Sequence, residues 1–433
     1  MENECNKLPF YNPILIFIIF FCFLLGCSKD NLYAKDIILP RKVANVKKIM
    51  VEKDSRYIIK RKINLRGETL IIPENCELVF DNGKFINGII VGNNTKLKKT
   101  EKNIFTNCEV RGTWYVGVSY SSMFDNKLDA SLLLKNLCVL SDSVLLSSDR
   151  SYIVSREELL LSCKYFASMS EENAVVLLKT SNPNLCGIIF SNLDIELCNI
   201  CFVDDFDEKN RKILVNDHRN GCTICAKAPK GNLQTVYIHD CTFEGGTPSS
   251  YFASSTVKEC VVSSCIFKDY MADHAVYCSM NIESFCVNNT ILQNVPYTTG
   301  LFKVRTSPVL KKFKLDSLTV RNLNGYLAVV ELIPNDAEIR FSNIDVRKDD
   351  DKDYKCYGVC IVKDKRKGEQ TGLSDAKTIV FDNCCFDYGY PGHPLVARGA
   401  GITVTSDTIV YRNVKAKDFT FTGGISRFKT IIE

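Results

Sequence analysis

Five side chains between residues 274 and 331 have the chemistry that a reaction on an acidic sugar chain requires. They are His274, Tyr277, Lys303, Arg305 and Glu331. A lyase needs a cation to neutralise the uronate carboxylate, and Lys303 or Arg305 would serve. It also needs a base and an acid, which His274 and Tyr277 could supply. These five residues are therefore the candidate catalytic residues.

Two other kinds of chemistry use overlapping residues. A glycoside hydrolase needs two carboxylates at a defined separation, for which Glu331 and Asp273 are the nearest candidates. A non-catalytic alternative is that opposite charges on a solvent face form ordinary cross-strand pairs. The residue types leave open a polysaccharide lyase, a glycosidase and a surface that only contacts polysaccharide.

Short strands must position these side chains. Alternation of apolar residues predicts strands at 275–278, 301–305, 327–332 and 359–363. Tyr277, Arg305 and Glu331 would point outward at separations of 28 and 26 residues, about one repeat each, and form one exposed column. The expected inward residues are Val276, Phe302, Val304, Ala328, Val330, Cys360 and Val362.

A pattern of about 25 residues recurs from Ile188 to Ala416. In each copy two alternating apolar residues lead to a small polar one and two more follow, as in Ile188-x-Phe190-x-Asn192. A period of two predicts strands, and the change of phase predicts a tight bend, since Asn and Asp tolerate the left-handed conformation. The other bends are expected at Asn107, Asp240, Ser264, Asn289, Ser317, Asn343, Asn383 and Asn413.

Stacked copies would superpose similar residues in columns. Ile188, Val236 and Cys260 begin one column, and Phe190, Ile238 and Val262 begin the next. This predicts an all-β fold, a right-handed parallel β-helix with one coil per repeat. A leucine-rich repeat is disfavoured because its leucine-dominated spacing is missing. Residues 129–140 are expected to form a helix within this solenoid.

The stretch from Gly67 to Thr95 alternates short β runs with Gly or Asn-Gly turns. It resembles the first coils of the pectate-lyase-like right-handed parallel β-helix superfamily, as found in bacterial surface proteins. The resemblance implies the architecture of about residues 60–430, but it carries no catalytic signature, so the fold comes without an assigned chemistry. Where polygalacturonase-type hydrolases have paired aspartates and Gly-His-Gly, the histidine here reads Pro391-Gly392-His393-Pro394.

The beginning of the chain predicts a lipid anchor. An apolar run at 14–25 is too short to span a bilayer but suits the core of a signal peptide. Leu24-Leu25-Gly26-Cys27 resembles a bacterial lipobox, which implies removal of a signal peptide at 1–26 and lipidation of Cys27. Residues 27–66 would form a tether and an irregular N-terminal cap, and residues 67–433 the β-helix domain. The tether resembles those of lipoproteins at the surface of the outer membrane.

Composition narrows the set of ligands. The 55 basic and 50 acidic residues give a net charge of only +5, so no nucleic-acid partner is expected. No Gly-rich phosphate loop follows a strand, so no cofactor is expected. Most of the 18 cysteines after Cys27 are expected to be unpaired and buried in core columns. The spacings Cys198-x-x-Cys201 and Cys222-x-x-Cys225 follow from period-two burial, and no metal site is expected.

Together these features predict a surface lipoprotein of the outer membrane that contacts an acidic polysaccharide. Its membrane contact would be through the N-terminal lipid. A non-catalytic or adhesive role is the leading interpretation, and a polysaccharide lyase or glycoside hydrolase is the alternative.

Overall fold

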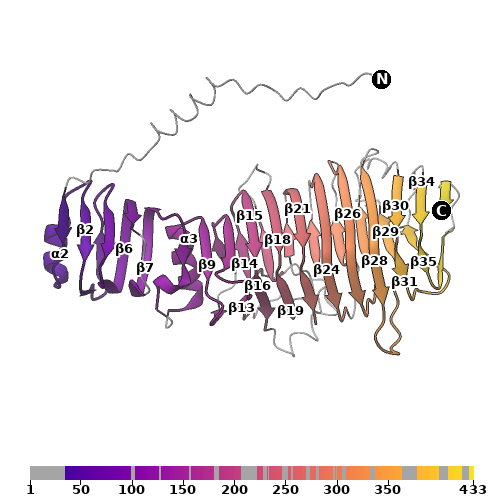
Figure 1. Cartoon of the computed structure of the whole chain (residues 1–433), viewed down its shortest axis with the longest axis horizontal. Helices are drawn as coiled ribbons and strands as arrows, with labels where there is room; N and C mark the ends of the chain where they lie inside the picture. The colour runs from indigo at the N-terminus through magenta and orange to yellow at the C-terminus, as the bar shows by residue number, and fades with distance from the viewer. Residues whose placement is uncertain are drawn as a thin grey trace, which may run out of the picture.

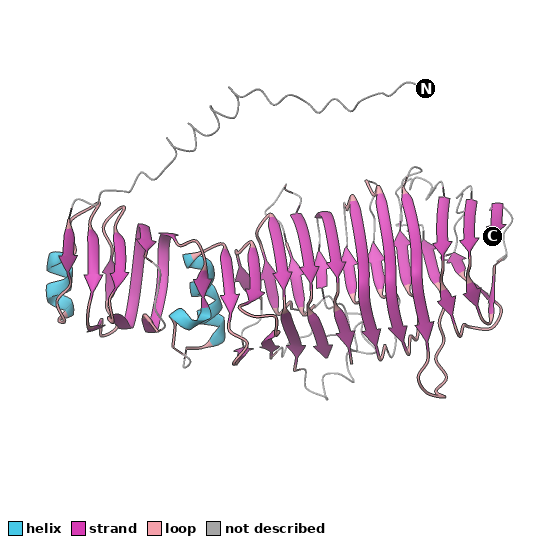
Figure 2. Ribbon diagram, in the orientation of Figure 1, coloured by secondary structure: helices cyan, strands magenta, loops and turns pink. Residues whose placement is uncertain are grey.

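The computed structural model describes residues 35–98, 103–125, 128–155, 158–179, 185–205, 222–227, 232, 234–245, 252–254, 257–269, 274–278, 282–295, 298, 300–304, 309–331, 337–362, 378–398, 408–421 and 429–433. These residues form an elongated stack of short strands that run across its long axis (Figure 1). The fold is mostly β with long parallel sheets, an all-β parallel solenoid (Figure 2). No helix in the part of the chain just given is long and apolar enough to cross a membrane.

The first sheet lies at the N-terminal end of the stack. Its strands are β1 (Asp36–Ile38), β2 (Arg56–Ile59), β3 (Lys62–Asn64), β4 (Thr69–Ile71), β5 (Glu77–Phe80), β6 (Lys84–Leu97) and β7 (Phe105–Tyr115). Helix α2 (Val43–Ile49) lies at the end of the rod and buries Val46 completely. Residues 56–64, expected within an irregular cap, thus already supply two strands of this sheet.

In the described part of the chain, the second sheet has 19 strands and runs through the rest of the stack. They are β8 (Ser119–Tyr120), β9 (Ser143–Leu146), β10 (Ser151–Val154), β12 (Tyr165–Ser168), β13 (Ala174–Leu178), β15 (Asp194–Cys198), β16 (Ile200–Asp204), β18 (Gln234–His239), β19 (Thr242–Gly245), β21 (Val257–Ser263), β22 (Ile266–Lys268), β24 (Ser284–Gln293), β26 (Lys312–Arg321), β28 (Glu338–Arg347), β30 (Thr378–Asp382), β31 (Cys385–Phe386), β34 (Thr408–Arg412), β35 (Lys415–Ala416) and β37 (Lys429–Ile432).

Among the residues described, the third sheet has nine strands, each in a successive repeat. They are β11 (Leu159–Leu161), β14 (Ile188–Phe190), β17 (Ile224–Ala226), β20 (Phe252–Ser254), β23 (Val276–Cys278), β25 (Phe302–Val304), β27 (Ala328–Glu331), β29 (Val359–Val362) and β33 (Val396–Arg398). A small parallel pair joins β32 (His393–Pro394) to β36 (Phe419–Thr420).

The predicted bends have left-handed backbone. The φ angles of the seven residues from the Asp240 bend to the Asn413 bend lie between 47° and 56°. Side-chain amides connect these bends along the stack: Asn383 Nδ2 donates to Asn343 Oδ1 at 2.8 Å, and Asn413 Nδ2 donates to Asn383 Oδ1 at 2.9 Å. Asparagine therefore serves twice, because it tolerates the bend and bonds to the next repeat.

The first copy of the repeat was assigned incorrectly from the sequence. Ile188 pairs with Ile224 in the third sheet, and Asn192 has no left-handed backbone. The bend of this repeat is at Asn199, whose φ is 53°. Ile195 and Leu197, which precede it, pair with Val236 and Ile238. Strands of the second and third sheets both alternate apolar residues. The alternation alone therefore does not distinguish a strand that precedes a bend from a strand of the third sheet.

The later columns are confirmed, and they build one continuous core. Val236, Cys260, Phe285, Phe313, Ile339, Ile379 and Ile409 follow one another in register. Rings stack within it, with Phe285 and Phe313 centroids 5.1 Å apart. Cys241, Cys265 and Cys384 are buried just after their bends, and none of the 18 cysteines that the structure describes, from Cys76 to Cys385, forms a disulfide.

Two short helices interrupt the stack, η1 (Ser121–Met123) and α3 (Ala130–Leu140). The side chain of Asp129 accepts a hydrogen bond from Leu132 N, which caps the predicted helix. Buried Asn136 accepts from Val110 N and donates to Cys108 O, each at 2.9 Å. Helix α3 thereby satisfies backbone groups of β7 that no following strand pairs.

Candidate functional site

The predicted site residues lie on or beside the third sheet. His274 precedes β23, Tyr277 lies within β23, and Lys303 lies in the neighbouring strand β25. Glu331 is the last residue of β27. Arg305, like the alternative carboxylate Asp273, falls outside the described residues.

The predicted column of Tyr277, Arg305 and Glu331 is wrong. Tyr277 pairs with Lys303, and Lys303 pairs with Val329 rather than with Glu331. Val329 in turn pairs with Cys360, so Cys360 lies in the row of Lys303 and not in the expected row of Val304, although both Val329 and Cys360 are buried. The expected direction of Val362 falls on a side chain outside the described ones. Val359 takes the inward row and is fully buried, because the connection before β29 is longer than the connections before β25 and β27.

His274, Tyr277 and Lys303 do come together. The imidazole and phenol ring centroids are 5.0 Å apart, and Lys303 Nζ lies 5.9 Å from the Tyr277 ring centroid. His274 is buried, and its Nδ1 lies 2.7 Å from the carbonyl oxygen of Gly300. Burial and this bond suit His274 to orienting Tyr277, while Tyr277 and Lys303 are half-buried and face outward.

Gly300 separates this group from a second one. A Cβ atom at Gly300 would lie 2.5 Å from Val329 Cγ2, so only glycine lets Val329 pack there. Gly300 stands two residues before β25, as His274 stands two before β23. The same position before β27 and β29 is held by Tyr326 and Tyr357.

Three tyrosines and a histidine form the second group, which we call the tyrosine cluster: Tyr326, Tyr357, Tyr390 and His393. Ring centroids are 5.3 Å apart from Tyr326 to Tyr357 and 5.4 Å from Tyr357 to Tyr390. The His393 ring lies 5.4 Å from that of Tyr357 and meets it edge-on. Tyr390 is 41% exposed, and the other three are half-buried, so the cluster presents aromatic surface to solvent.

A cation lies beside the tyrosine cluster. Lys355 Nζ is 5.9 Å from the Tyr390 ring centroid and 3.6 Å from Asp353 Oδ2. The sequence reasoning missed Tyr326, Tyr357, Tyr390 and Lys355, and took His393 only as a mismatch to a hydrolase motif. A usable signal was present, since Tyr326 and Tyr357 each precede an apolar strand by two residues.

Protonation states at the tyrosine cluster follow from its burial. Burial raises the pKa of Tyr326, and the nearby Cys360 and Tyr357 add to this effect, so that the pKa is about 12. Burial also lowers the pKa of His393, although a hydrogen bond to Pro394 O opposes the change. His393 is therefore uncharged near neutral pH, and none of the described side chains hydrogen-bonds to its Nε2.

A second histidine lies on the 19-stranded sheet with different surroundings. His239 Nε2 is 3.0 Å from Glu196 Oε1, and Nδ1 is 2.8 Å from Asp240 Oδ2. Burial lowers the pKa of His239, but the hydrogen bonds to Asp240 and Glu196 outweigh this effect and raise the pKa. Both nitrogens donate in the charged form, so His239 is suited to an ion-pair network and not to proton abstraction.

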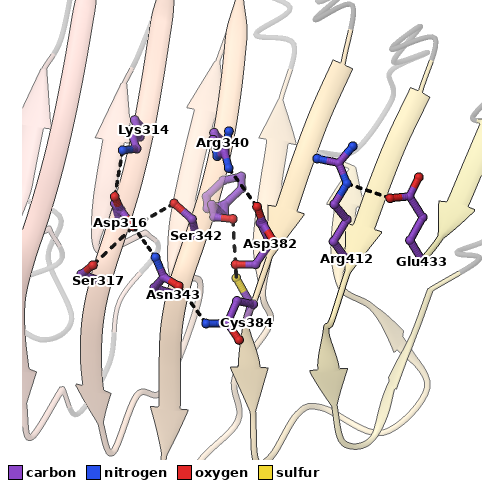
Figure 3. A network of polar contacts seen from close by, with 12 residues as sticks. Lys314, Asp316, Ser317, Arg340, Ser342, Asn343, Asp382, Cys384, Arg412 and Glu433 are labelled. Carbon is purple, nitrogen blue, oxygen red and sulfur yellow. Dashed lines mark hydrogen bonds and ion pairs between the residues drawn. The ribbon is translucent and has the colours of Figure 1, made fainter.

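The same sheet carries a polar ladder near its C-terminal end, shown in Figure 3. Asp316 accepts hydrogen bonds from Lys314 Nζ at 2.8 Å, Ser342 Oγ at 2.9 Å and Asn343 Nδ2 at 3.0 Å. Burial would raise the pKa of Asp316, but these three donors lower it to about 2. The carboxylate is committed to linking neighbouring repeats and is not a candidate acid.

The chain matches no protein-family model, no curated protein and no solved structure. The side chains on and beside the third sheet include half-exposed tyrosine rings, the neutral His393 of β32 and the two lysines Lys303 and Lys355. Such a surface can bind the apolar faces of sugar rings and contact their carboxylates.

Proposed function

We propose that this protein binds an acidic polysaccharide, without cleaving it, along the outer side of its third sheet. The proposal includes a right-handed parallel β-helix of the pectate-lyase-like kind, held at the surface of the outer membrane by a lipidated Cys27. The observation that carries the binding role is the tyrosine cluster, in which Tyr326, Tyr357 and Tyr390 supply three neighbouring rings.

Aromatic rings suit sugars for a simple electrostatic reason. The face of a phenol ring is electron-rich, and the C–H groups on one face of a pyranose carry small positive charges. Rings about one strand spacing apart along a straight sheet favour a chain polymer over a small ligand. Lys303 beside Tyr277 and Lys355 beside Tyr390 add positive charge, which favours carboxylate-bearing sugars.

Binding without cleavage accounts for most of the local chemistry. His274 is buried with its Nδ1 bonded to backbone, and Tyr277 faces Lys303 rather than a carboxylate. Each of these groups has a role in packing or in binding, and none requires a reaction.

Retention in native gels containing polysaccharide tests this role. Polygalacturonate serves as the acidic probe and a neutral galactan as its uncharged counterpart. The double variant Tyr326→Ala with Tyr357→Ala should lose about tenfold or more in affinity, since an aromatic contact contributes roughly 1 kcal/mol. Tyr237→Ala is the matched control, because Tyr237 is 40% exposed on the other large sheet. Equal retention of both variants and the wild type would contradict the proposal.

One observation favours a lyase as the second candidate. His393 is neutral, and among the described residues nothing hydrogen-bonds to its Nε2, so it could take the proton beside a uronate carboxylate. Elimination would break the C4–oxygen bond, form a C4–C5 double bond and return a proton to the leaving oxygen. Absorbance of the unsaturated product, measured apart from new reducing ends, distinguishes a lyase from a hydrolase. Neither signal, together with retention on the gel, supports binding alone.

A further inference from the structure

Three cysteines from two neighbouring repeats lie close together near the N-terminal end of the third sheet, at β14 and β17. Cys186 and Cys222 hold equivalent positions, two residues before β14 and β17. Cys225 lies within β17 at a position paired with Ile189. The sulfur atoms of all three lie within 4.8 Å of one another, and Cys186 Sγ is 3.0 Å from Cys222 Sγ.

This arrangement differs from burial of cysteine as a small apolar residue. Cys222 is buried, but Cys186 and Cys225 are only half-buried, so the cluster lies at the edge of the core and not within it. Among the residues that the structure describes, no other three cysteines meet in this way. The Cys222-x-x-Cys225 spacing gains a third sulfur only because the strand pairing places Cys186 beside it.

We propose that Cys186, Cys222 and Cys225 bind one thiophilic metal ion, of the class of zinc or copper(I). Bonds of about 2.3 Å from one ion to three thiolates require sulfur separations of about 3.8 Å, so small side-chain rotations within the present cluster suffice. Thiolates select soft ions over calcium or magnesium. Binding replaces S–H bonds with metal–sulfur bonds and releases the protons to water.

A disulfide between Cys186 and Cys222 is the competing chemistry, because these two sulfurs are closest. It would consume two sulfurs and leave Cys225 without a role. The two possibilities make opposite predictions for Cys225, which is needed for a three-sulfur metal site and not for a disulfide.

Cobalt(II) is the probe for the experiment, since its bonds to thiolate give charge-transfer absorbance. The full-length protein is reduced, freed of metal with a chelator and titrated without oxygen. We expect one equivalent of cobalt(II) to bind and to be displaced by zinc(II) or copper(I), whichever the site prefers. Cys186→Ser and Cys225→Ser should each weaken binding by more than about 100-fold, because even groups that only orient a ligand account for 10–100-fold.

Cys286→Ser is the matched control, since Cys286 is half-buried in β24 and outside the cluster. It should bind cobalt(II) as the wild type does, and circular dichroism should show all variants folded. No charge-transfer band in the reduced wild type would overturn the proposal. An unchanged band in Cys225→Ser would overturn it as well, as would a native Cys186–Cys222 disulfide whose reduction yields no cobalt binding.

Discussion

Tyr326 and Tyr357 occupy the same position in neighbouring repeats, two residues before β27 and β29, with ring centroids 5.3 Å apart. The strand pairing of Ala328 with Val359 fixes this relationship. The parallel stack therefore converts a sequence separation of 31 residues into adjacent rings on one surface. Side chains at any other solvent-facing position of the repeat can form a row along the stack in the same way.

The charges of Lys303 and Lys355 should determine the preference for acidic sugars. Replacing both lysines, Lys303→Met with Lys355→Met, keeps the length of each side chain and removes its charge. We expect affinity for polygalacturonate to fall about tenfold, since a hydrogen bond to a charged group contributes roughly 1.5–3 kcal/mol and these sites are half-exposed. Affinity for a neutral glycan should not change. Loss of both affinities together would mean that the variant had lost its structure.

Asn343 tests the double role of the bend residues. Its φ is 52°, and it donates to Asp316 and accepts from Asn383. Asn343→Ala should cost about 1–3 kcal/mol in unfolding free energy, through backbone strain and lost hydrogen bonds. Asn343→Gly relieves the strain and should cost less. Equal costs in denaturant titrations would show that the bend conformation contributes nothing.

His239 and His393 should affect stability with opposite dependence on pH. The pKa of His239 is raised, so its contribution is fully present below the unfolded value of 6.5 and disappears as pH rises through the folded pKa. His239→Asn should cost up to about 1 kcal/mol at acidic pH and almost nothing at alkaline pH. The pKa of His393 is lowered, so protonation destabilises the fold, and His393→Asn should reduce acid sensitivity. Thermal unfolding across pH measures both, and parallel trends would contradict the assignment.

Cys265 tests the cysteine column. It is buried, and burial raises the pKa of its thiol to about 12, so it packs as a small neutral group. Cys265→Asp should prevent folding, because it places an unpaired charge in a continuous core. Cys265→Ala should cost far less. Thiol labelling of the denatured wild type without reductant should find most of the 18 cysteines free, and a count near zero would contradict this account.

Cys27 lies outside the described residues, and its lipidation stays a prediction from the sequence. Cys27→Ser should release the protein from membranes into the soluble fraction. Incorporation of a labelled fatty acid into the wild type is the direct measurement. Membrane association of the variant, together with no label in the wild type, would exclude the anchor.

Much of the inner structure could be predicted because it is encoded locally. From Asp240 to Asn413 each bend is a small polar residue between apolar pairs, and both the bends and the columns lie where they were expected. The copy at Ile188 was misplaced because a strand of the third sheet has the same alternation as a strand before a bend.

The outer surface could not be predicted in the same way. Which outward residues become neighbours depends on how many residues each connection uses, and period-two alternation carries no information about that number. Tyr277 was expected beside Arg305 and lies beside Lys303, two residues earlier. Tyr390 packs against Tyr357, although it does not hold the position two residues before the next strand, β33, that Tyr326 and Tyr357 hold before β27 and β29.

Helix α3 has a mechanical consequence. Among the strands the structure describes, the ladder of the first sheet ends at β7, and the ladder of the second begins at β8. Around α3 the two sheets are joined by side-chain packing, by the two Asn136 hydrogen bonds and by backbone hydrogen bonds from Asn103 to Ser122 and from Asp125 to Phe105, and not by a continuous ladder. Under tension or heat, this seam is where the molecule should part first, and each half should then unravel from its newly exposed end.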